Sequence, residues 1–153
     1  YMSRHYEQSI AVLGDVIRTD PHFPISYWLQ AGNLLAVQRV DEAILCAEQL
    51  VRLTDEAMFA LATLAVAYIT AGRQEEMLRV DERMNELSKK RYDSPVFRAI
   101  YNLGTGDRSA VLECLEKAYD ERESMMAFLA VIPVFDQVRQ DPRFQNLVQK
   151  MGL

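Results

Sequence analysis

Residues 65–77, Ala-Val-Ala-Tyr-Ile-Thr-Ala-Gly-Arg-Gln-Glu-Glu-Met, decide the fold that this sequence predicts. They have the pattern of an apolar helix end, a glycine turn and the polar beginning of a second helix. Similar sequence recurs at the same spacing in both directions, so that Gly72 corresponds to Gln38 and to Gly106. A small residue stands seven positions before each turn, at Ala31, Ala65 and Ala99. We therefore expect a chain built from helix–turn–helix repeats.

The composition favours an all-helical fold and disfavours a nucleic-acid partner. The chain has 153 residues, of which 50% are hydrophobic, and this is enough for one well-filled domain. Its net charge of −5 disfavours binding to a phosphate backbone, which requires a basic surface. The single basic cluster, residues 89–91, falls at the end of an expected helix, where cations suit the exposed carbonyl groups.

The cysteines and the longest apolar run indicate which cellular compartment we expect for the protein. Cys46 and Cys114 stand two repeat periods apart, too far for the Cα separation of about 5–6 Å in a disulfide, which is compatible with a reducing compartment. The longest apolar run, residues 57–71, is shorter than the roughly 20 residues of a membrane span. We expect no membrane insertion and a cytoplasmic location, or a periplasmic one if a parent chain carries an upstream membrane span.

The pattern divides the chain into repeats. Residues 1–22 are expected to form the second helix of a truncated repeat, so that the chain is a piece of a longer protein. Three helix pairs follow, over residues 23–54, 55–91 and 92–123. After residue 123 the register is lost, and residues 124–153 are expected to cap the array, because terminal units of repeat proteins must cover an open end. Asp141 is the expected N-cap of a short helix over residues 143–151.

The repeating unit, with its period of about 34 residues, resembles the tetratricopeptide repeat. The resemblance covers about residues 3–123 and rests on the small residues given above, on the aromatic Tyr68, on the second-helix residues Ala43 and Ala118, and on the closing Pro21. The pattern is broken in two places, at Asp81 and Asn102. The resemblance implies an all-α superhelical solenoid of antiparallel helix pairs, with a C-terminal capping helix.

The C-terminal part of the chain indicates the kind of larger protein to which the repeats belong. Residues 106–108, 115–122 and 135–144 are similar to the C-terminal ends of repeat regions in bacterial signalling proteins, which include winged-helix transcriptional activators, serine/threonine kinases and nucleotide cyclases. This similarity implies a sensory or regulatory module of such a protein, whose effector domain would lie upstream.

The sequence contains few residues in patterns typical of catalytic, cofactor or metal sites. The only two histidines, His5 and His22, belong to no zinc-binding motif. Gly104 and Gly106 lack the third glycine and the preceding strand of a dinucleotide-binding fingerprint. Paired acidic residues have the pattern of solvated helix faces. We therefore expect no enzyme, no cofactor and no metal site.

The resemblance also implies a binding surface. In tetratricopeptide arrays the first helix of each pair lines a concave groove that receives an extended peptide. Carried over to this sequence, that groove is strongly apolar and lacks the lysine, asparagine and arginine side chains with which some relatives clamp a C-terminal carboxylate. The expected groove residues are Trp28, Leu29, Leu35, Phe59, Val66, Ile69, Phe97 and Ile100.

An exposed apolar groove of this kind needs a covering. Residues 125–138 could fold back on it or cap the last repeat. A hydrophobic protein or peptide could bind it, with Trp28 and Phe97 as aromatic anchors. A second copy of the chain could also pack there, as a homodimer. The expected function is protein–protein interaction, and the alternative is a homo-oligomerisation module for upstream effector domains.

Overall fold

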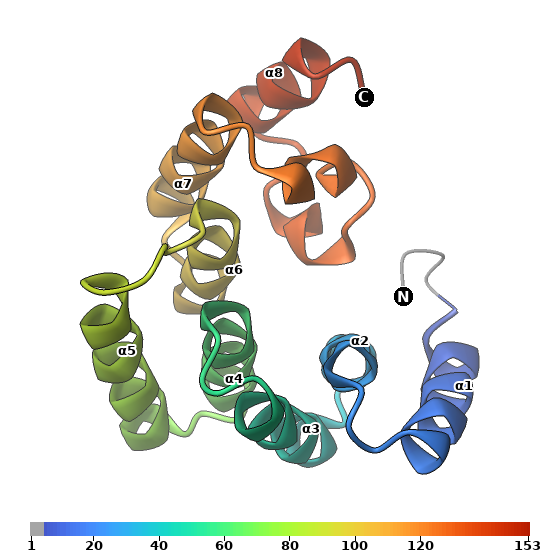
Figure 1. Ribbon diagram of the computed structural model, residues 1–153. Helices are drawn as coiled ribbons and strands as arrows, with labels where there is room; N and C mark the ends of the chain where they lie inside the picture. The colour runs from blue at the N-terminus through green and yellow to red at the C-terminus, as the bar shows by residue number, and fades with distance from the viewer. Residues whose placement is uncertain (1–4) are drawn as a thin grey trace. The chain divides into compact units, whose positions relative to one another are not determined.

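The computed structural model describes residues 5–153, and over that range the chain is helical and contains no strand (Figure 1). The all-α fold class is confirmed. Residues 1–4, part of the expected truncated repeat, lie outside the described residues. In chain order the helices are α1 (Tyr6–Thr19), α2 (Pro24–Ala36), α3 (Val40–Leu53), α4 (Met58–Thr70), α5 (Gln74–Ser88), α6 (Pro95–Thr105), α7 (Arg108–Asp120) and α8 (Pro142–Lys150), with two 3₁₀-helices, η1 (Ser124–Phe128) and η2 (Pro133–Gln137), before α8.

The chain divides into two compact units. The first ends at Arg91 and contains α1 to α5, and the second runs from Tyr92 to Leu153. The division falls where the repeat over residues 55–91 is expected to end.

In the first unit, helices that follow one another in sequence pack side by side. α2 contacts α1, α3 and α4, and α4 also contacts α3 and α5. As Figure 1 shows, α2 and α4 therefore form one layer along one side of this unit, and α1, α3 and α5 lie along its other side.

The helices recur with the predicted period, which is the spacing from Gln38 to Gly72. The start of α4 lies one such period after the start of α2, and the start of α5 lies one period after the start of α3. The turns between paired helices repeat as well, because Gln38, Gly72 and Gly106 all have left-handed φ values, of 62°, 70° and 82°. A left-handed residue one or two positions after the last helical residue ends the helix and redirects the chain. The expectation of helix–turn–helix repeats is confirmed.

Gln38 and Gly72 allow a paired test of this turn. A side chain in the left-handed region clashes with the backbone, and glycine does not. We expect Gln38→Gly to raise the free energy of unfolding by about 0.5–1 kcal/mol and Gly72→Ala to lower it by about 1 kcal/mol. An added Cβ at Gly72 meets nothing within 4 Å, so that backbone strain is the main effect there. Urea unfolding of both variants measures this, and changes of the same sign would refute the shared turn.

The small residues stand where the repeat pattern requires close packing. Ala31, Ala65 and Ala99 are each 0% exposed. A larger side chain at these positions would force neighbouring helices apart, since protein interiors are close-packed.

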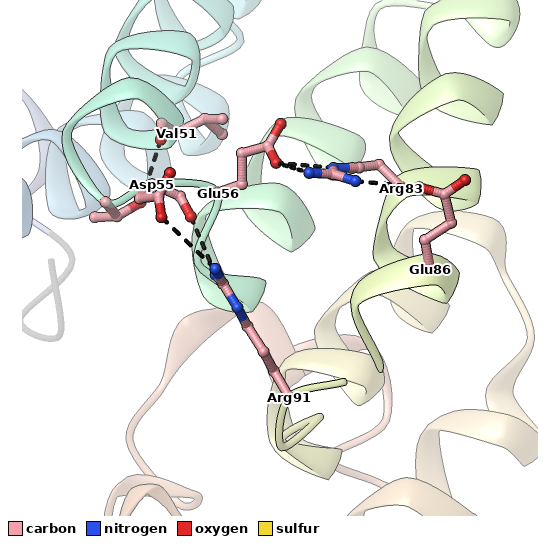
Figure 2. A network of polar contacts seen from close by, with 7 residues as sticks. Val51, Asp55, Glu56, Arg83, Glu86 and Arg91 are labelled. Atoms are coloured by element: carbon pink, nitrogen blue, oxygen red, sulfur yellow. Dashed lines mark hydrogen bonds and ion pairs between the residues drawn. The ribbon is translucent and has the colours of Figure 1, made fainter. Parts of the chain in front are cut away.

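The connection from α3 to α4 is held by two arginines (Figure 2). Asp55 and Glu56 both have left-handed φ values, of 48° and 57°. Arg83 of α5 donates through Nε and Nη2 to Oε2 of Glu56, at 2.8 and 2.5 Å, and through Nη1 to Glu86. Arg91 donates to the backbone oxygen of Asp55 at 3.2 Å. All these side chains are well exposed, so that solvent screens each pair and its contribution to stability is small.

The second unit contains the helix pair α6 and α7 and the segment after it. η2 packs against α6, and α8 packs against α7. Arg143 at the start of α8 donates two hydrogen bonds to Glu116 of α7, at 2.9 and 2.7 Å. Asp141 is the N-cap of α8, since its Oδ1 accepts a hydrogen bond from the Arg143 backbone N–H at 2.8 Å, as predicted.

The segment over residues 124–138 buries every third residue. A 3₁₀-helix has three residues per turn, so that positions i and i+3 lie on the same edge. That edge is turned into the core of the second unit, and Phe135 packs on Phe144 of α8 with ring centroids 6.3 Å apart. The buried side chains of the segment are Met126, Leu129, Ile132, Phe135 and Val138.

The two departures from the repeat pattern have different surroundings. Asn102 of α6 donates a hydrogen bond to Sγ of Cys114 on α7, at 3.5 Å, so that a polar contact joins the two helices there. Asp81 of α5 is partly exposed and accepts a hydrogen bond from Asn85, one turn further along the same helix.

Candidate functional site

The layer formed by α2 and α4 contains no charged side chain. Neither Pro24–Ala36 nor Met58–Thr70 includes Asp, Glu, Lys, Arg or His. Every other α-helix of the described chain has at least one charged residue. An uncharged pair of adjacent helices is unusual in a chain with 25% charged residues, and it is the main feature of the candidate site.

Each of these helices has one stripe that is largely buried and one that is partly exposed. On α2 the partly exposed stripe is Ile25, Trp28, Leu29, Gly32 and Leu35, with Ile25 42% exposed. These positions follow the i, i+3, i+4, i+7 spacing of one helix face. On α4 the corresponding stripe is Phe59, Ala62, Thr63, Val66 and Ile69, of which Ala62 and Thr63 are buried.

The two stripes meet at an aromatic pair. Trp28 of α2 and Phe59 of α4 have ring centroids 6.2 Å apart and an interplanar angle of 85°. This edge-to-face geometry is favourable for aromatic rings. Both rings remain partly exposed. They hold the two helices together and also present apolar surface.

The other expected groove residues lie in three settings. Leu29, Val66 and Ile69 are partly exposed on the α2 and α4 stripes. Leu35 packs against the buried cluster of Ile10, Leu34 and Ala43, so that it is partly a core residue. Phe97 and Ile100 are partly exposed on α6, in the second unit. The candidate site is therefore confined to α2 and α4.

The hydroxyl and amide side chains of α2 and α4 are all engaged within the chain. Each donates at least one hydrogen bond to a backbone or side-chain acceptor within the chain. The pairs are Ser26 to Phe23, Tyr27 to Pro21, Gln30 to Ile10, Asn33 to Ser9, Thr63 to Phe59, Tyr68 to Glu48 and Thr70 to Val66.

A buried polar stripe on the other side of α2 was not foreseen. Ser26, Gln30 and Asn33 are buried, and the latter two donate hydrogen bonds to α1. Oε1 of Gln30 and Oδ1 of Asn33 accept no hydrogen bond from the residues that the structure describes. One period later α4 has apolar side chains at the same positions, so that aligning the repeats would have exposed the difference. Those positions are Ala60, Leu64 and Ala67.

The cysteines are poor nucleophiles. Both are free thiols. Burial raises the pKa of the Cys46 thiol to about 11, and the nearby carboxylate of Glu42 adds to the effect. Burial also raises the pKa of Cys114. The thiolate is the reactive form, so neither residue is suited to covalent chemistry near neutral pH.

We expect the alkylation rate of Cys46 to reflect this pKa. In a Cys114→Ser variant at about pH 8, only roughly one Cys46 in a thousand would be a thiolate, and the iodoacetamide rate should rise about tenfold per pH unit up to about pH 11. In urea the profile should level off near the ordinary thiol pKa of about 8.5. Because the folded chain keeps a proton that the unfolded chain loses, this thiol destabilises the fold as the pH rises above about 8.5. A plateau near pH 8.5 in the folded chain would contradict the burial.

The described part of the chain has neither a metal-binding cluster nor a membrane-spanning helix. No group of three or more His, Cys, Asp or Glu side chains is placed to hold a metal ion there. None of the helices over residues 5–153 is both long and apolar enough to cross a membrane. Comparison of the chain with protein-family models, with curated proteins and with solved structures found no match.

Proposed function

We propose that this chain is a protein-interaction module that binds a protein or peptide through the partly exposed face of α2 and α4. One observation carries the proposal: two adjacent helices present apolar side chains around the Trp28–Phe59 pair and contain no charge. Exposed apolar surface rimmed by polar residues is typical of binding sites, and tryptophan is enriched among the residues that dominate binding energy.

The sequence resemblance supports a finer proposal. The helix pairs would be tetratricopeptide repeats stacked as a solenoid, in the sensory or regulatory region of a bacterial signalling or transcription-regulatory protein, and in the cytoplasm. The common period of the helix starts and the repeated left-handed turns support the repeat assignment. The bacterial context rests on the similarity of residues 106–108, 115–122 and 135–144, and the compartment rests on the two cysteines, which form no disulfide.

A displayed library of random peptides tests the proposed function. The chain is immobilised, and enriched peptides are retested against two matched variants. Ile25→Glu introduces a charge beside Trp28 on the exposed stripe, and Leu45→Glu introduces the same charge on α3, where Leu45 is 64% exposed. Neither removes a buried side chain, so that both should fold.

We expect peptides whose binding is lost with Ile25→Glu and kept with Leu45→Glu. No enrichment, or equal losses with both variants, would refute the binding face. Sedimentation of the free chain tests the homo-oligomerisation alternative. A concentration-dependent dimer that Ile25→Glu abolishes, and Leu45→Glu does not, would assign the face to a second copy.

A further inference from the structure

We propose that α1 is a releasable helix, which separates from α2 as one unit while α2 to α5 stay folded. Its release uncovers the side of α2 on which Gln30 and Asn33 are buried, and so changes the surface of the first unit without unfolding it. This motion does not depend on what binds to α2 and α4.

α1 has fewer buried side chains than any other α-helix of the described chain. Ile10 is its one buried residue, whereas even the short α8 buries two. Ile10 packs in a cluster with Leu34 of α2. The apolar side chains that follow at helical spacing, Leu13, Val16 and Ile17, remain partly exposed. Apolar stabilisation is roughly proportional to the area removed from water, so that the contact of α1 with α2 is weak.

Two buried amides of α2 face α1. Gln30 donates a hydrogen bond to the backbone oxygen of Ile10 at 3.3 Å, and Asn33 donates to Oγ of Ser9 at 2.7 Å. Gln30 is 8% exposed and Asn33 is 0% exposed. Among the residues that the structure describes, Oε1 of Gln30 and Oδ1 of Asn33 have no donor.

The amides weaken the packed state of α1. Their oxygens lose hydration on burial and regain it when α1 moves away. The bond from Gln30 offsets little of this loss, because the Ile10 carbonyl already accepts the intrahelical bond of α1. One period later the same two positions of α4 are Leu64 and Ala67, whose side chains are buried and have no polar atom. α4 therefore carries no such penalty.

The surroundings of α1 permit its release. The connection to α2, residues 20–23, is exposed throughout. α2 also packs against α3 and α4, so that it keeps these contacts when α1 leaves. Glu7 of α1 lies 3.9 Å from Nη1 of Arg39, but both side chains are exposed and solvent screens the pair. Release thus breaks mainly the contact between α1 and α2.

Native-state hydrogen exchange of the full chain tests the release. The backbone amides of residues 10–19 should exchange together, with protection factors at least about 100-fold lower than those of the best protected amides in α4. Urea below the unfolding midpoint should hardly change the protection of α1, because its release exposes little surface, but should steeply lower that of α4. Equal protection of α1 and α4, or protection that rises steadily from residue 10 to residue 19, would contradict release as a unit.

Gln30→Leu tests the cause. It gives α2 the residue that α4 has one period later, and it should raise the protection factors of the α1 amides by at least about tenfold. Gln8→Leu is the matched control, because Gln8 is exposed on α1, and it should change them by less than about threefold. If Gln30→Leu lowers the protection of α1, the amide holds the helix in place and the proposed cause is wrong.

Leu61→Ala separates the release of α1 from unfolding of the whole unit. Leu61 is a buried residue of α4, a helix that packs against α2, α3 and α5. Its truncation should lower the protection of the α4 amides by at least about tenfold and leave that of the α1 amides unchanged. If both fall by the same factor, α1 opens only together with the rest of the unit and is not a releasable helix. The wild-type chain in urea makes the same distinction without a substitution.

Discussion

Phe135→Ala is expected to lower the free energy of unfolding by about 3–5 kcal/mol, the usual range for removing a buried phenylalanine. Phe135 is 0% exposed and packs on Phe144 of α8. It belongs to η2, which packs against α6. Truncating it leaves a cavity at the point where the helix pair, η2 and α8 of the second unit meet. The loss should appear as a lower urea midpoint, measured by far-ultraviolet circular dichroism.

Phe128→Ala is the matched control. Phe128 ends η1 and is 45% exposed, so that the same truncation there should change the free energy of unfolding by less than about 1 kcal/mol. Equal losses for Phe128→Ala and Phe135→Ala would show that the three-residue period of burial over residues 124–138 is wrong.

Trp28→Ala is expected to weaken the binding of a peptide selected on the chain by at least about 30-fold, or roughly 2 kcal/mol. Trp28 presents the largest apolar side chain of the uncharged layer, at the point where α2 and α4 meet. Titration calorimetry with the selected peptide measures the loss.

Two further variants separate binding from folding. Trp28→Phe keeps an aromatic ring beside Phe59 and should retain most of the affinity. Leu45→Ala removes an exposed side chain from α3 and should leave the affinity unchanged. If Trp28→Ala binds normally while it remains folded, the aromatic pair is not the anchor of the site.

Much of the fold could be predicted from the sequence, because local signals and the repeat agree. Pro24 and Pro95 begin α2 and α6, and Asp141 caps α8. The turn at Gln38 was predictable only from its alignment with Gly72 and Gly106, since glutamine itself does not favour a left-handed φ. A period shared by three segments outweighs the propensity of one residue.

Other features were hidden from pattern reasoning. Residues 124–138 bury every third position, and this period differs from those of the α-helix and the strand. The left-handed pair Asp55 and Glu56 contains no glycine, and the arginines that contact it come from far along the chain. Such contacts depend on tertiary packing, which a local pattern does not contain.

The candidate site was predictable in part. The stripes on α2 and α4 follow from the helical period, so that Trp28, Phe59 and Val66 could be assigned to one kind of face. The mixed role of Leu35 depends on how α1, α2 and α3 meet, and only the structure shows this. The hydrogen bonds that the hydroxyl and amide groups of the two helices donate within the chain also required coordinates.

Acrylamide quenching of Trp28 fluorescence tests the central claim most directly, because Trp28 is the single tryptophan of the chain. The measurement compares the free chain with the chain saturated by a selected peptide that contains no tryptophan, with saturation established independently from the anisotropy of a labelled peptide. If the uncharged face of α2 and α4 is the binding surface, the free chain is quenched and the bound peptide shields Trp28, lowering the quenching constant several-fold. An unchanged quenching constant at full saturation would place the peptide elsewhere and contradict the proposed function.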